Sequence, residues 1–443
     1  MSRARAPVIA LLLASAWACE RQPAVPQAEP EPSAPTCPAG PVAAAFAPGI
    51  DAALERASQW SSPIDETVLL DHAALTQLRA RRADADDPWR AGWDGAHALL
   101  DAGARLSSYE AEIAKGELIE TEPGALAAAR ALLEAAEPVD HARLVVRETQ
   151  LWCAPLRGTL LSGSRDPAFD RNLCTSLHGG ELVRVLARTD GGRWLLVDAG
   201  HTLGWLPPTD LSTRLREEDR LAWRGAPSLW IRRDGVRTEG GVELRMGVAL
   251  PLLADEPTRA RVQVAGPQGP VEDSVAKDDG IAIGALPLTR GAVVAAAFRQ
   301  LGAPYGWGGR NGARDCSQWL RDLLLPFGVA LPRHSSQQAQ AGVTTVDVRG
   351  LSDADKLAAI ERAAGTGLVL EYMPGHIMLD VGGRDGRRYA ISAIAEFVTP
   401  CEGGGETLWR LDRVAVTDLE TGRGSARGAF VERITTLAVL GPA

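Results

Sequence analysis

The sequence lacks several features that mark large classes of proteins. Acidic residues outnumber basic ones by 56 to 47, so the formal net charge is −9. This balance argues against the basic surface of a nucleic-acid-binding protein and against a polybasic patch for membrane attachment. The six cysteines are too few for a disulfide scaffold, and they show neither a CxxC pair nor the Cys/His spacing of a zinc site.

The chain is nevertheless able to fold and to bury sizeable cores. Its 443 residues are 45% hydrophobic and 23% charged, which excludes disorder throughout the chain. At about 150 residues per domain, this length predicts roughly three domains.

The N-terminus has the composition of an export signal. Two arginines precede an apolar run over residues 6–18, which ends in an Ala-x-Ala cleavage site directly before Cys19. At 1.5 Å per residue the run reaches about 20 Å, too short for a helix that crosses a hydrocarbon core of about 30 Å. The signal therefore predicts an exported protein from which residues 1–18 are removed.

The cysteine after this cleavage site resembles the acylated cysteine of bacterial lipoproteins. Cys19 would carry the lipid after cleavage, and Glu20 would favour the outer membrane of a Gram-negative cell. Ala16 departs from the pattern, because lipoproteins usually have Leu at this position, so simple secretion stays open. In either case we expect a protein of the bacterial cell envelope, either periplasmic or an outer-membrane lipoprotein.

Composition and patterning divide the rest of the chain into five segments. Proline predicts an extended tether, helical periodicity follows, and short runs of Val, Leu and Trp then alternate with Gly and Asp turns. The run Gly204-Trp205-Leu206-Pro207 resembles part of a bacterial SH3 barrel, and a weaker pattern of this kind comes after it. The predicted segments are a Pro-rich tether (19–48), a helical stabilising domain (49–138), SH3-like domain 1 (139–215), SH3-like domain 2 (216–287) and a C-terminal domain (288–443).

The C-terminal segment predicts an α+β domain. Thr289 is the expected N-cap of one helix, and Ser352 begins another with a capping box. Between them, Cys316 shares one face with apolar residues at i+3, i+4, i+7, i+8 and i+11, which places it in the first turn of a buried helix. Helices followed by antiparallel strands indicate an α+β fold. The expected strands cover residues 367–372, 376–381 and 388–393.

Cys316 is the candidate nucleophile. Asp315 occupies the N-cap position before it, and the amides of the first helical turn point toward the sulfur. Because these amides and the helix dipole stabilise an anion, we expect the thiolate to form at a lower pH than in a free cysteine. The same amides would hold an oxyanion. A lone cysteine on an apolar helix face is more often structural, so the assignment depends on its partners.

His376 is the candidate base. The strand that it begins alternates in polarity, so His376 faces away from Ile377. If residues 382–386 form the hairpin loop, His376 lies directly opposite Ser392, with Cβ atoms about 5 Å apart. A hydroxyl there can orient the imidazole, so the sequence supplies a nucleophile, a base and an orienting residue.

Four ordered motifs in the C-terminal segment resemble the NlpC/P60 cysteine peptidases of bacterial cell walls. The resemblance extends over about residues 288–443, and a helical segment with two SH3 domains before it is an arrangement known in that family. The motifs are Leu301-Gly302-Ala303-Pro304-Tyr305-Gly306-Trp307-Gly308-Gly309, Asp315-Cys316-Ser317, Leu331-Pro332-Arg333-His334-Ser335-Ser336-Gln337-Gln338 and Pro374-Gly375-His376.

The resemblance implies a papain-like fold and cleavage of peptidoglycan stem peptides, commonly between D-γ-glutamate and a diamino acid. It assigns Cys316 as the nucleophile and His376 as the base. The residues that it assigns to the L-Ala-D-Glu portion of the substrate are Tyr305, Asp315 and Ser317. The Asp315 carboxylate would pair with a free L-Ala ammonium and so select stems already released from the glycan. An ordinary N-cap is the alternative role, and one residue can serve both.

Ser392 departs from the family pattern, in which the third catalytic residue is usually His and in some members Asn or Gln. Serine accepts the imidazole N–H but is short and neutral, so it orients the ring less firmly, or through a water. We therefore expect lower activity than with a histidine here, or a catalytically dead domain. His334 is a rival for the catalytic histidine, in a loop where the family usually has a non-catalytic polar residue.

An exported protein permits disulfides. With the lipidated cysteine and the nucleophile set aside, four cysteines allow three pairings. We favour Cys153 with Cys174, which lie in the same β-rich segment, and the pairing of Cys37 with Cys401 is then possible by elimination only.

The leading hypothesis is a peptidoglycan hydrolase: a monomeric cysteine endopeptidase that needs no metal or organic cofactor. Cys316 would attack the γ-D-glutamyl carbonyl, and His376 would transfer the proton to the leaving amine. The expected partners are peptidoglycan stem peptides or muropeptides, with no nucleic acid and with a membrane only through Cys19. The alternative is a weak or inactive wall-binding protein that acts through its SH3-like domains.

Overall fold

The computed structural model describes residues 37–442 apart from 39, 82–85, 157, 164 and 403. The predicted signal peptide (1–18), Cys19 and most of the Pro-rich tether (19–48) therefore lie outside the described residues. Within the described ranges, no helix is both long enough and apolar enough to span a bilayer.

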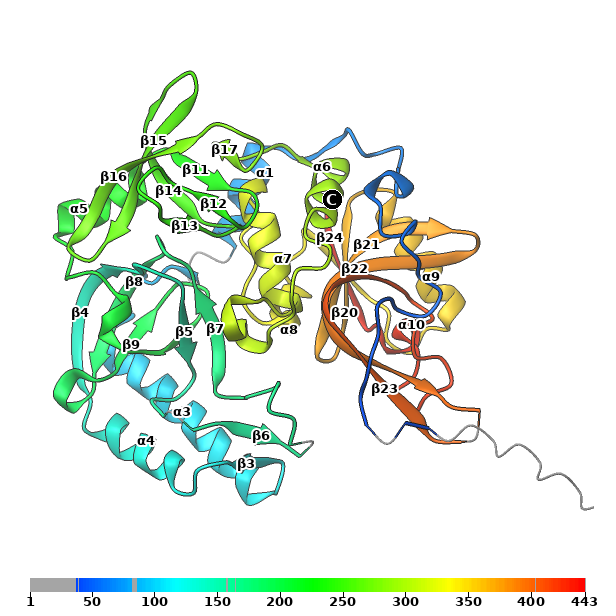
Figure 1. Ribbon diagram of the computed structural model, residues 1–443, viewed down its shortest axis with the longest axis horizontal. Helices are drawn as coiled ribbons and strands as arrows, with labels where there is room; N and C mark the ends of the chain where they lie inside the picture. The colour runs from blue at the N-terminus through cyan, green and yellow to red at the C-terminus, as the bar shows by residue number, and fades with distance from the viewer. Residues whose placement is uncertain are drawn as a thin grey trace, which may run out of the picture.

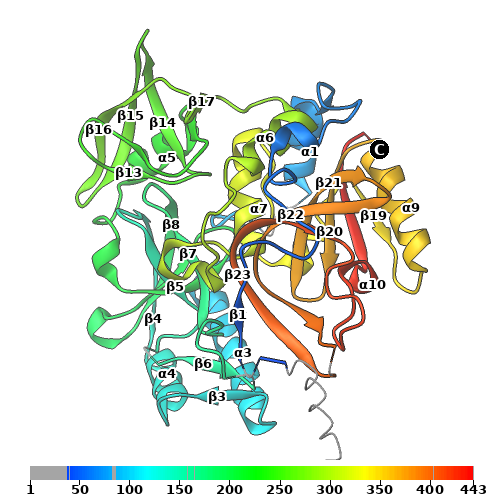
Figure 2. The same cartoon turned by 45° about the vertical axis from the view of Figure 1, so that its right-hand side comes forward.

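Three larger β-sheets, several helices and three two-stranded sheets form the described molecule (Figure 1). A seven-stranded sheet built mainly from the C-terminal part lies on one side, and a six-stranded and a five-stranded sheet lie on the other. Helix α7 (Cys316–Leu324) runs between the two sides in both views (Figure 2). The candidate nucleophile, at the start of α7, thus lies between the seven-stranded sheet and the two other larger sheets.

The seven-stranded sheet has the order β1-β23-β22-β21-β20-β24-β19. Its neighbouring strands pair antiparallel except for β1 and β23, which are parallel. The three strands predicted from sequence are confirmed as β20, β21 and β22. The strands are β1 (Val42–Ala43), β19 (Thr344–Asp347), β20 (Leu368–Met373), β21 (His376–Arg384), β22 (Arg387–Pro400), β23 (Glu406–Asp418) and β24 (Thr436–Leu440).

The helices of this part begin where their caps predicted. Asp315 caps α7 by accepting the amide N–H of Gln318 at 3.0 Å, and Ser352 caps α9 by accepting that of Asp355 at 3.2 Å. The apolar face of α7 packs into the same core as β20, β21 and β22. The remaining helices are α6 (Arg290–Phe298), α8 (Ser335–Gln338), α9 (Asp353–Ala364) and α10 (Phe430–Arg433).

The β-rich middle of the chain forms two sheets, with the orders β4-β8-β9-β10-β5-β7 and β16-β15-β14-β11-β17. In neither does a described pairing join the first strand to the last, so both sheets are open and the SH3-like barrels stay a prediction. The strands are β4 (Glu137–Leu144), β5 (Thr149–Trp152), β7 (Leu173–Leu177), β8 (Leu182–Arg188), β9 (Leu195–Asp198), β10 (Leu203–Leu206), β11 (Ser228–Ile231), β14 (Ala249–Asp255), β15 (Arg259–Gly266), β16 (Gly269–Ala276) and β17 (Ile281–Ile283).

The predicted helical segment contains helices that do not share one core. Leu75 and Leu78 of the first helix pack into the core of the C-terminal sheet. Leu106 and Tyr109 of the second pack with residues of the first β-rich segment. The segment is therefore divided between two neighbours. Its helices are α1 (His72–Ala80), α3 (Gly95–Ala114) and α4 (Ala125–Glu134).

The structure contains the disulfide favoured from sequence and also the second pairing, which the sequence left possible by elimination only. Cys153 is bonded to Cys174, with Cα atoms 5.1 Å apart, and Cys37 is bonded to Cys401, with Cα atoms 5.9 Å apart. The second bond fixes the N-terminal segment to the sheet in which β1 pairs with β23. Among the cysteines that the structure describes, Cys316 is the one with a free thiol, as a nucleophile requires.

Candidate active site

Cys316 lies in the first turn of α7 and is buried, with 6% of its surface exposed. The helix packs against β21 and β22, the two strands that carry His376 and Ser392. The local sequence explains the placement, because Asp315 caps the helix and the apolar face holds it on the sheet. The fold thus brings the nucleophile helix against the hairpin expected to carry the base.

The pKa of the Cys316 thiol differs from the sequence prediction. Burial, and then the negative charge of Asp315, raise this pKa to about 12. Hydrogen bonds from the backbones of Ile377 and Ser317 and the charge of Arg333 offset only part of the increase. The expectation of a low thiol pKa was wrong, because it counted the helix amides and left out the desolvation of an enclosed sulfur. The resting nucleophile is a neutral thiol.

His376 and Ser392 are in contact, as predicted. The Nε2 atom of His376 lies 3.0 Å from the Oγ atom of Ser392, whose side chain is fully buried in β22. His376 itself is partly exposed at the start of β21. Because Nε2 is engaged by the serine, Nδ1 is the nitrogen left to exchange a proton with a nucleophile.

The register used to predict this contact was wrong. Residues 382–384 belong to β21, so the expected loop over 382–386 shrinks to a tight turn, and β21 contains a bulge. Beyond the bulge Leu379 pairs with Ile391, and continuing this register by one residue places Ser392 opposite Met378, two residues from His376. Residues two apart share a face of the strand, so the imidazole reaches the hydroxyl along a diagonal between the strands.

The pKa of His376 is lowered to about 4 by burial, and then by the positive charge of Arg433. At neutral pH the imidazole is therefore uncharged, and so is the Cys316 thiol, whose pKa lies near 12. A neutral pair of this kind suits transfer of the thiol proton as the sulfur attacks, in place of a preformed thiolate–imidazolium pair.

Arg333 is a buried residue to which the sequence analysis gave no role. Its guanidinium donates to the two oxygens of Asp315 at 3.0 and 2.5 Å, and to Oγ of Ser317 at 2.8 Å. The Ser317 hydroxyl and the amides of Gly308 and Gln318 also donate to Asp315, at 3.0–3.1 Å. Five donors thus surround a carboxylate that offers about four acceptor positions.

This environment changes what Asp315 can do. Burial would raise the pKa of Asp315, but Arg333 and the hydrogen bonds from the backbone hold it below its ordinary value. The N-cap role is confirmed. A substrate ammonium, the partner expected from the resemblance, would have to compete with Arg333 for the same oxygens. Arg333 stands in the Leu-Pro-Arg motif, so the sequence drew attention to it. Nothing in the sequence indicated that Arg333 pairs with Asp315.

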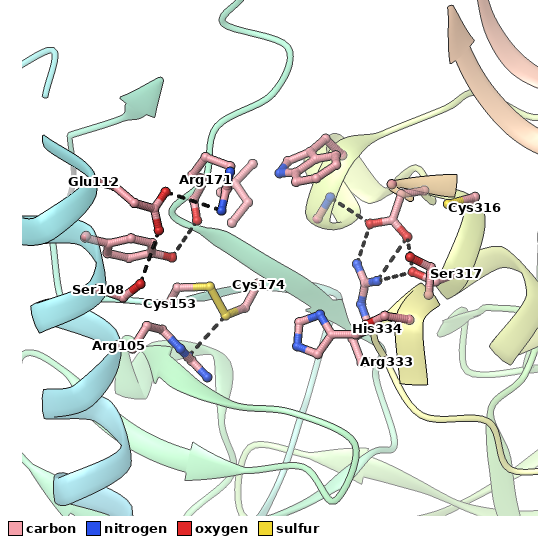
Figure 3. A pocket seen from close by; sticks show the side chains of 18 of the residues that line it. Arg105, Ser108, Glu112, Cys153, Arg171, Cys174, Cys316, Ser317, Arg333 and His334 are labelled. Atoms are coloured by element: carbon pink, nitrogen blue, oxygen red, sulfur yellow. Dashed lines mark hydrogen bonds and ion pairs between the residues drawn. A yellow bond between two sulfur atoms is a disulfide. The ribbon is translucent and has the colours of Figure 1, made fainter. Parts of the chain in front are cut away.

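A cleft opens in front of the nucleophile (Figure 3). Its volume is about 500 Å³. One wall carries residues 315–317, and the opposite wall is formed by residues of α3, of β7 and of the segments next to β7. Tyr305 and His376 line an adjoining cavity of about 210 Å³, and Trp307 and Gly375 border both. The predicted residues Tyr305, Asp315, Cys316, Ser317 and His376 therefore lie along two neighbouring cavities, whereas Ser392 lines neither of them.

Tyr305 lies close to the nucleophile. Burial, and then the charges of Cys316 and Asp315, raise the pKa of its phenol well above the ordinary value. The hydroxyl therefore stays protonated at neutral pH and is able to donate a hydrogen bond to a substrate.

His334 lines the same cleft as Cys316 (Figure 3). Its ring forms no hydrogen bond with any residue that the structure describes, whereas Ser392 orients the ring of His376. A general base needs a positioned imidazole, so the geometry favours His376.

Two glycines allow the first β-rich segment to form the wall of the cleft. A Cβ atom on Gly308 would lie 2.4 Å from the carbonyl oxygen of Leu173, and one on Gly309 would lie 2.3 Å from the amide nitrogen of Ser176. Both glycines also have positive φ, at 58° and 80°. The Gly-Gly pair of the motif is thus required by the direct contact of this loop with β7.

Part of the chain is similar in sequence to known proteins. The model of the NlpC/P60 family matches residues 302–384. Probable endopeptidases of Mycobacterium tuberculosis and Mycobacterium bovis are 40% identical over 82 residues, which are 18% of this chain and 21% of each relative. The chain thus spans about a fifth of the length of these curated relatives.

A solved structure shares the fold over most of the chain. The NlpC/P60 endopeptidase from Photobacterium damselae subsp. piscicida superimposes with a TM-score of 0.72, covering 91% of this chain and 100% of that one. The sequences are 14% identical, so this likeness concerns the fold alone. The match of the family model identifies an NlpC/P60 family domain in the C-terminal part of this chain, and the shared fold is consistent with it.

Proposed function

We propose that the protein is a cysteine endopeptidase of the cell wall, which hydrolyses the bond between D-γ-glutamate and a diamino acid in peptidoglycan stem peptides. One observation carries the proposal. The imidazole of His376 lies 3.0 Å from the hydroxyl of Ser392 and belongs to strand β21. Helix α7, which carries the free thiol of Cys316, packs against this strand. The family of the C-terminal domain and the endopeptidase relatives support it.

The reaction follows from the two neutral side chains. The Cys316 sulfur attacks the γ-carbonyl carbon while Nδ1 of His376 takes the thiol proton. Backbone amides at the start of α7 stabilise the oxyanion. The C–N bond then breaks, and the imidazolium gives its proton to the leaving amine. Water, deprotonated by the same imidazole, hydrolyses the thioester and restores the thiol.

The cleft in Figure 3 suits the acyl portion of the substrate, L-Ala-D-Glu. Ser317 carries a hydroxyl group in this cleft, where it donates to Asp315 at 3.1 Å, and Tyr305 lies close to the nucleophile at the edge of the adjoining cavity. The neighbouring cavity at His376 would then receive the diamino acid that leaves. The open β-sheets, proposed to be SH3-like, would position the wall polymer.

The proposal includes where in the cell the protein acts. An export signal over residues 1–18 and lipidation of Cys19 would deliver the protein to the periplasm or to the outer membrane, where its substrate is found. Globomycin, which blocks lipoprotein signal cleavage, would cause the precursor to accumulate if Cys19 is lipidated.

The experiment compares the purified protein with its Cys316→Ala variant on L-Ala-γ-D-Glu-meso-diaminopimelate. Mass spectrometry should detect L-Ala-D-Glu and free diaminopimelate with the native protein only. Equal absence of product from both would favour the second candidate, a wall-binding protein. The observation behind that alternative is Ser392, a neutral hydroxyl in the position of the orienting residue.

A further inference from the structure

Helix α7 is buried on two opposite faces. Leu320 and Leu324 on its apolar face pack into the core of the C-terminal sheet. Gln318 and Asp322 lie four residues apart and share the other face, where a helix at the surface of a protein usually exposes its polar side chains. These two side chains belong to residues that are only 2% and 0% exposed. The polar face of the nucleophile helix is therefore covered by another part of the chain.

The covering part is the first β-rich segment, whose strand β7 runs beside α7 (Figures 1 and 2). Gln318 donates to the hydroxyl of Ser176 on β7 at 2.7 Å. His178, which directly follows β7, has its Nε2 atom 3.0 Å from Oδ2 of Asp322. Both contacts join residues more than 140 positions apart in the chain. The helix of Cys316 is thus held between the C-terminal sheet and the first β-rich segment.

Asp322 is a buried, ionised carboxylate. Burial would raise its pKa, but His178, Arg314 and Arg321 hold that pKa well below the ordinary value. A carboxylate only accepts hydrogen bonds, so Nε2 of His178 is the donor in this contact. Arg314 also donates to Oδ2, at 2.6 Å, and Arg321 donates to Oδ1, at 3.0 Å. Arg314 in turn pairs with Asp234 of the second β-rich segment at 2.7 Å.

Two histidines of the first β-rich segment hold this carboxylate. His178 reaches Oδ2 directly. His201 reaches Oδ1 through Arg321, whose guanidinium lies 2.9 Å from the Nδ1 atom of His201. Burial and then the charge of Arg321 lower the pKa of His201 well below the ordinary value, so its ring is neutral and accepts from the arginine. Arg321 belongs to α7 itself, so the histidines are the groups that fix the helix to this segment.

We propose that His178 is a positioning residue: by donating to Asp322 it keeps α7, and with it Cys316, seated against strand β21. The first β-rich segment then belongs to the catalytic apparatus and is not only a module for binding the wall. His178 lines neither catalytic cavity, so it acts through the helix and not on the substrate. A displacement of about 1 Å can reduce a rate by about 100-fold, so a small movement of α7 is enough. This inference rests on the proposed function.

The test compares two substitutions of similar size, one that can donate to Asp322 and one that cannot. With L-Ala-γ-D-Glu-meso-diaminopimelate as the substrate, His178→Leu should lower kcat at least tenfold and change KM by less than twofold. His178→Gln keeps a donor, so its kcat should stay within threefold of the native value. A role in packing alone would affect the two variants alike. Equal kcat values for the two, or a native kcat in His178→Leu, would overturn the inference while leaving the proposed function intact.

His141→Leu is the matched control. His141 is partly buried in β4, at the opposite edge of the same six-stranded sheet, where it accepts a hydrogen bond from Arg143 at 3.1 Å. The substitution removes an imidazole from the same segment at the sheet edge away from α7, so kcat should keep its native value. An equal fall of kcat in His141→Leu and His178→Leu would show a general effect on the segment and would also overturn the inference.

Hydrogen exchange followed by mass spectrometry keeps the inference testable if the protein cleaves no stem. The amides of α7 should exchange at least tenfold faster in His178→Leu than in the native protein, whereas those of the β15–β16 hairpin should not change. This result without cleavage by the native protein would remove the proposed function alone. Native protection of α7 in His178→Leu would overturn the inference.

A milder variant serves if His178→Leu does not fold. His201→Leu removes the acceptor of Arg321 at a position that is only partly buried. It should lower kcat by threefold or more and speed the exchange of the α7 amides. A native kcat together with native exchange in this variant would overturn the inference.

Discussion

Arg333 and Asp315 form a two-hydrogen-bond ion pair, buried directly beside the nucleophile, with 3% and 6% of their surfaces exposed. Removing one partner of such a pair leaves an uncompensated charge, which typically costs about 3–5 kcal/mol. We therefore expect Arg333→Ala to lower the free energy of unfolding by about this amount and to reduce kcat strongly. Urea denaturation would measure the first effect.

The control for this prediction is the double variant Arg333→Ala with Asp315→Asn. It removes the stranded charge, so it should recover part of the lost stability without restoring activity. If the single variant unfolds at the urea concentration of the native protein, the ion pair has no part in holding the site together.

The acid limit of activity should lie far below that of a free histidine. His376 must be neutral to accept the thiol proton, and burial and Arg433 lower its pKa to about 4. Activity is therefore kept as the pH falls through 6.5 and is lost only near pH 4. The measurement is kcat/KM against pH, with circular dichroism at each point to exclude unfolding. A limb near pH 6.5 would contradict this assignment.

Arg433 should set part of that limit. Its positive charge is the second cause, after burial, of the low pKa of His376. Arg433→Gln removes this charge, so the acid limb of kcat/KM should move to higher pH. Arg362→Gln, a change in α9 and outside both catalytic cavities, is a suitable control and should leave the limb in place. An unmoved limb in Arg433→Gln would show that burial alone determines the pKa.

Local features of the C-terminal part could be predicted from the sequence because they depend on neighbours along the chain. The helix that begins at Cys316 follows from apolar spacing and from the cap at Asp315. The contact between His376 and Ser392 followed from strand alternation, although the register was wrong. An error of two positions preserves the face, so the prediction survived a tight turn and a bulge that the sequence did not reveal.

Features that depend on distant segments could not be predicted in this way. The cleft wall comes from Arg105 on α3, more than 200 residues before the nucleophile, and no local pattern links the two. The pKa of Cys316 also depends on how completely the fold encloses the sulfur, which periodicity does not measure. Tertiary burial outweighed the effect of the helix amides there.

Ser392 should contribute to turnover by orienting His376. Ser392→Ala removes the hydroxyl that lies 3.0 Å from Nε2, so the ring loses its partner while the backbone pairing of β22 with β23 remains. Loss of an orienting partner commonly costs about 10–100-fold. We expect kcat to fall by at least tenfold with little change in KM. Ser425→Ala, in the same part of the chain, is the control.

Glu371 should make the folded state less stable as the pH rises. It is fully buried in β20, and burial and then the charge of Asp380 raise its pKa well above the ordinary value. The folded state therefore keeps this proton, while the unfolded state releases it above about pH 4.5. The contribution of this group to stability is complete below that pH and is lost as the pH rises toward the folded pKa.

Replacing Glu371 with glutamine tests this assignment. Glutamine has the shape of the protonated acid and carries no ionisable group, so Glu371→Gln should raise the midpoint of thermal unfolding at pH 7.5. The gain should shrink toward pH 4, where the native side chain is protonated in both states. Glu361→Gln, at an exposed carboxylate that pairs with Arg388, is the comparison and should show no such gain. A Glu371→Gln difference that is constant between pH 4 and 7.5 would mean that this carboxyl does not titrate on unfolding.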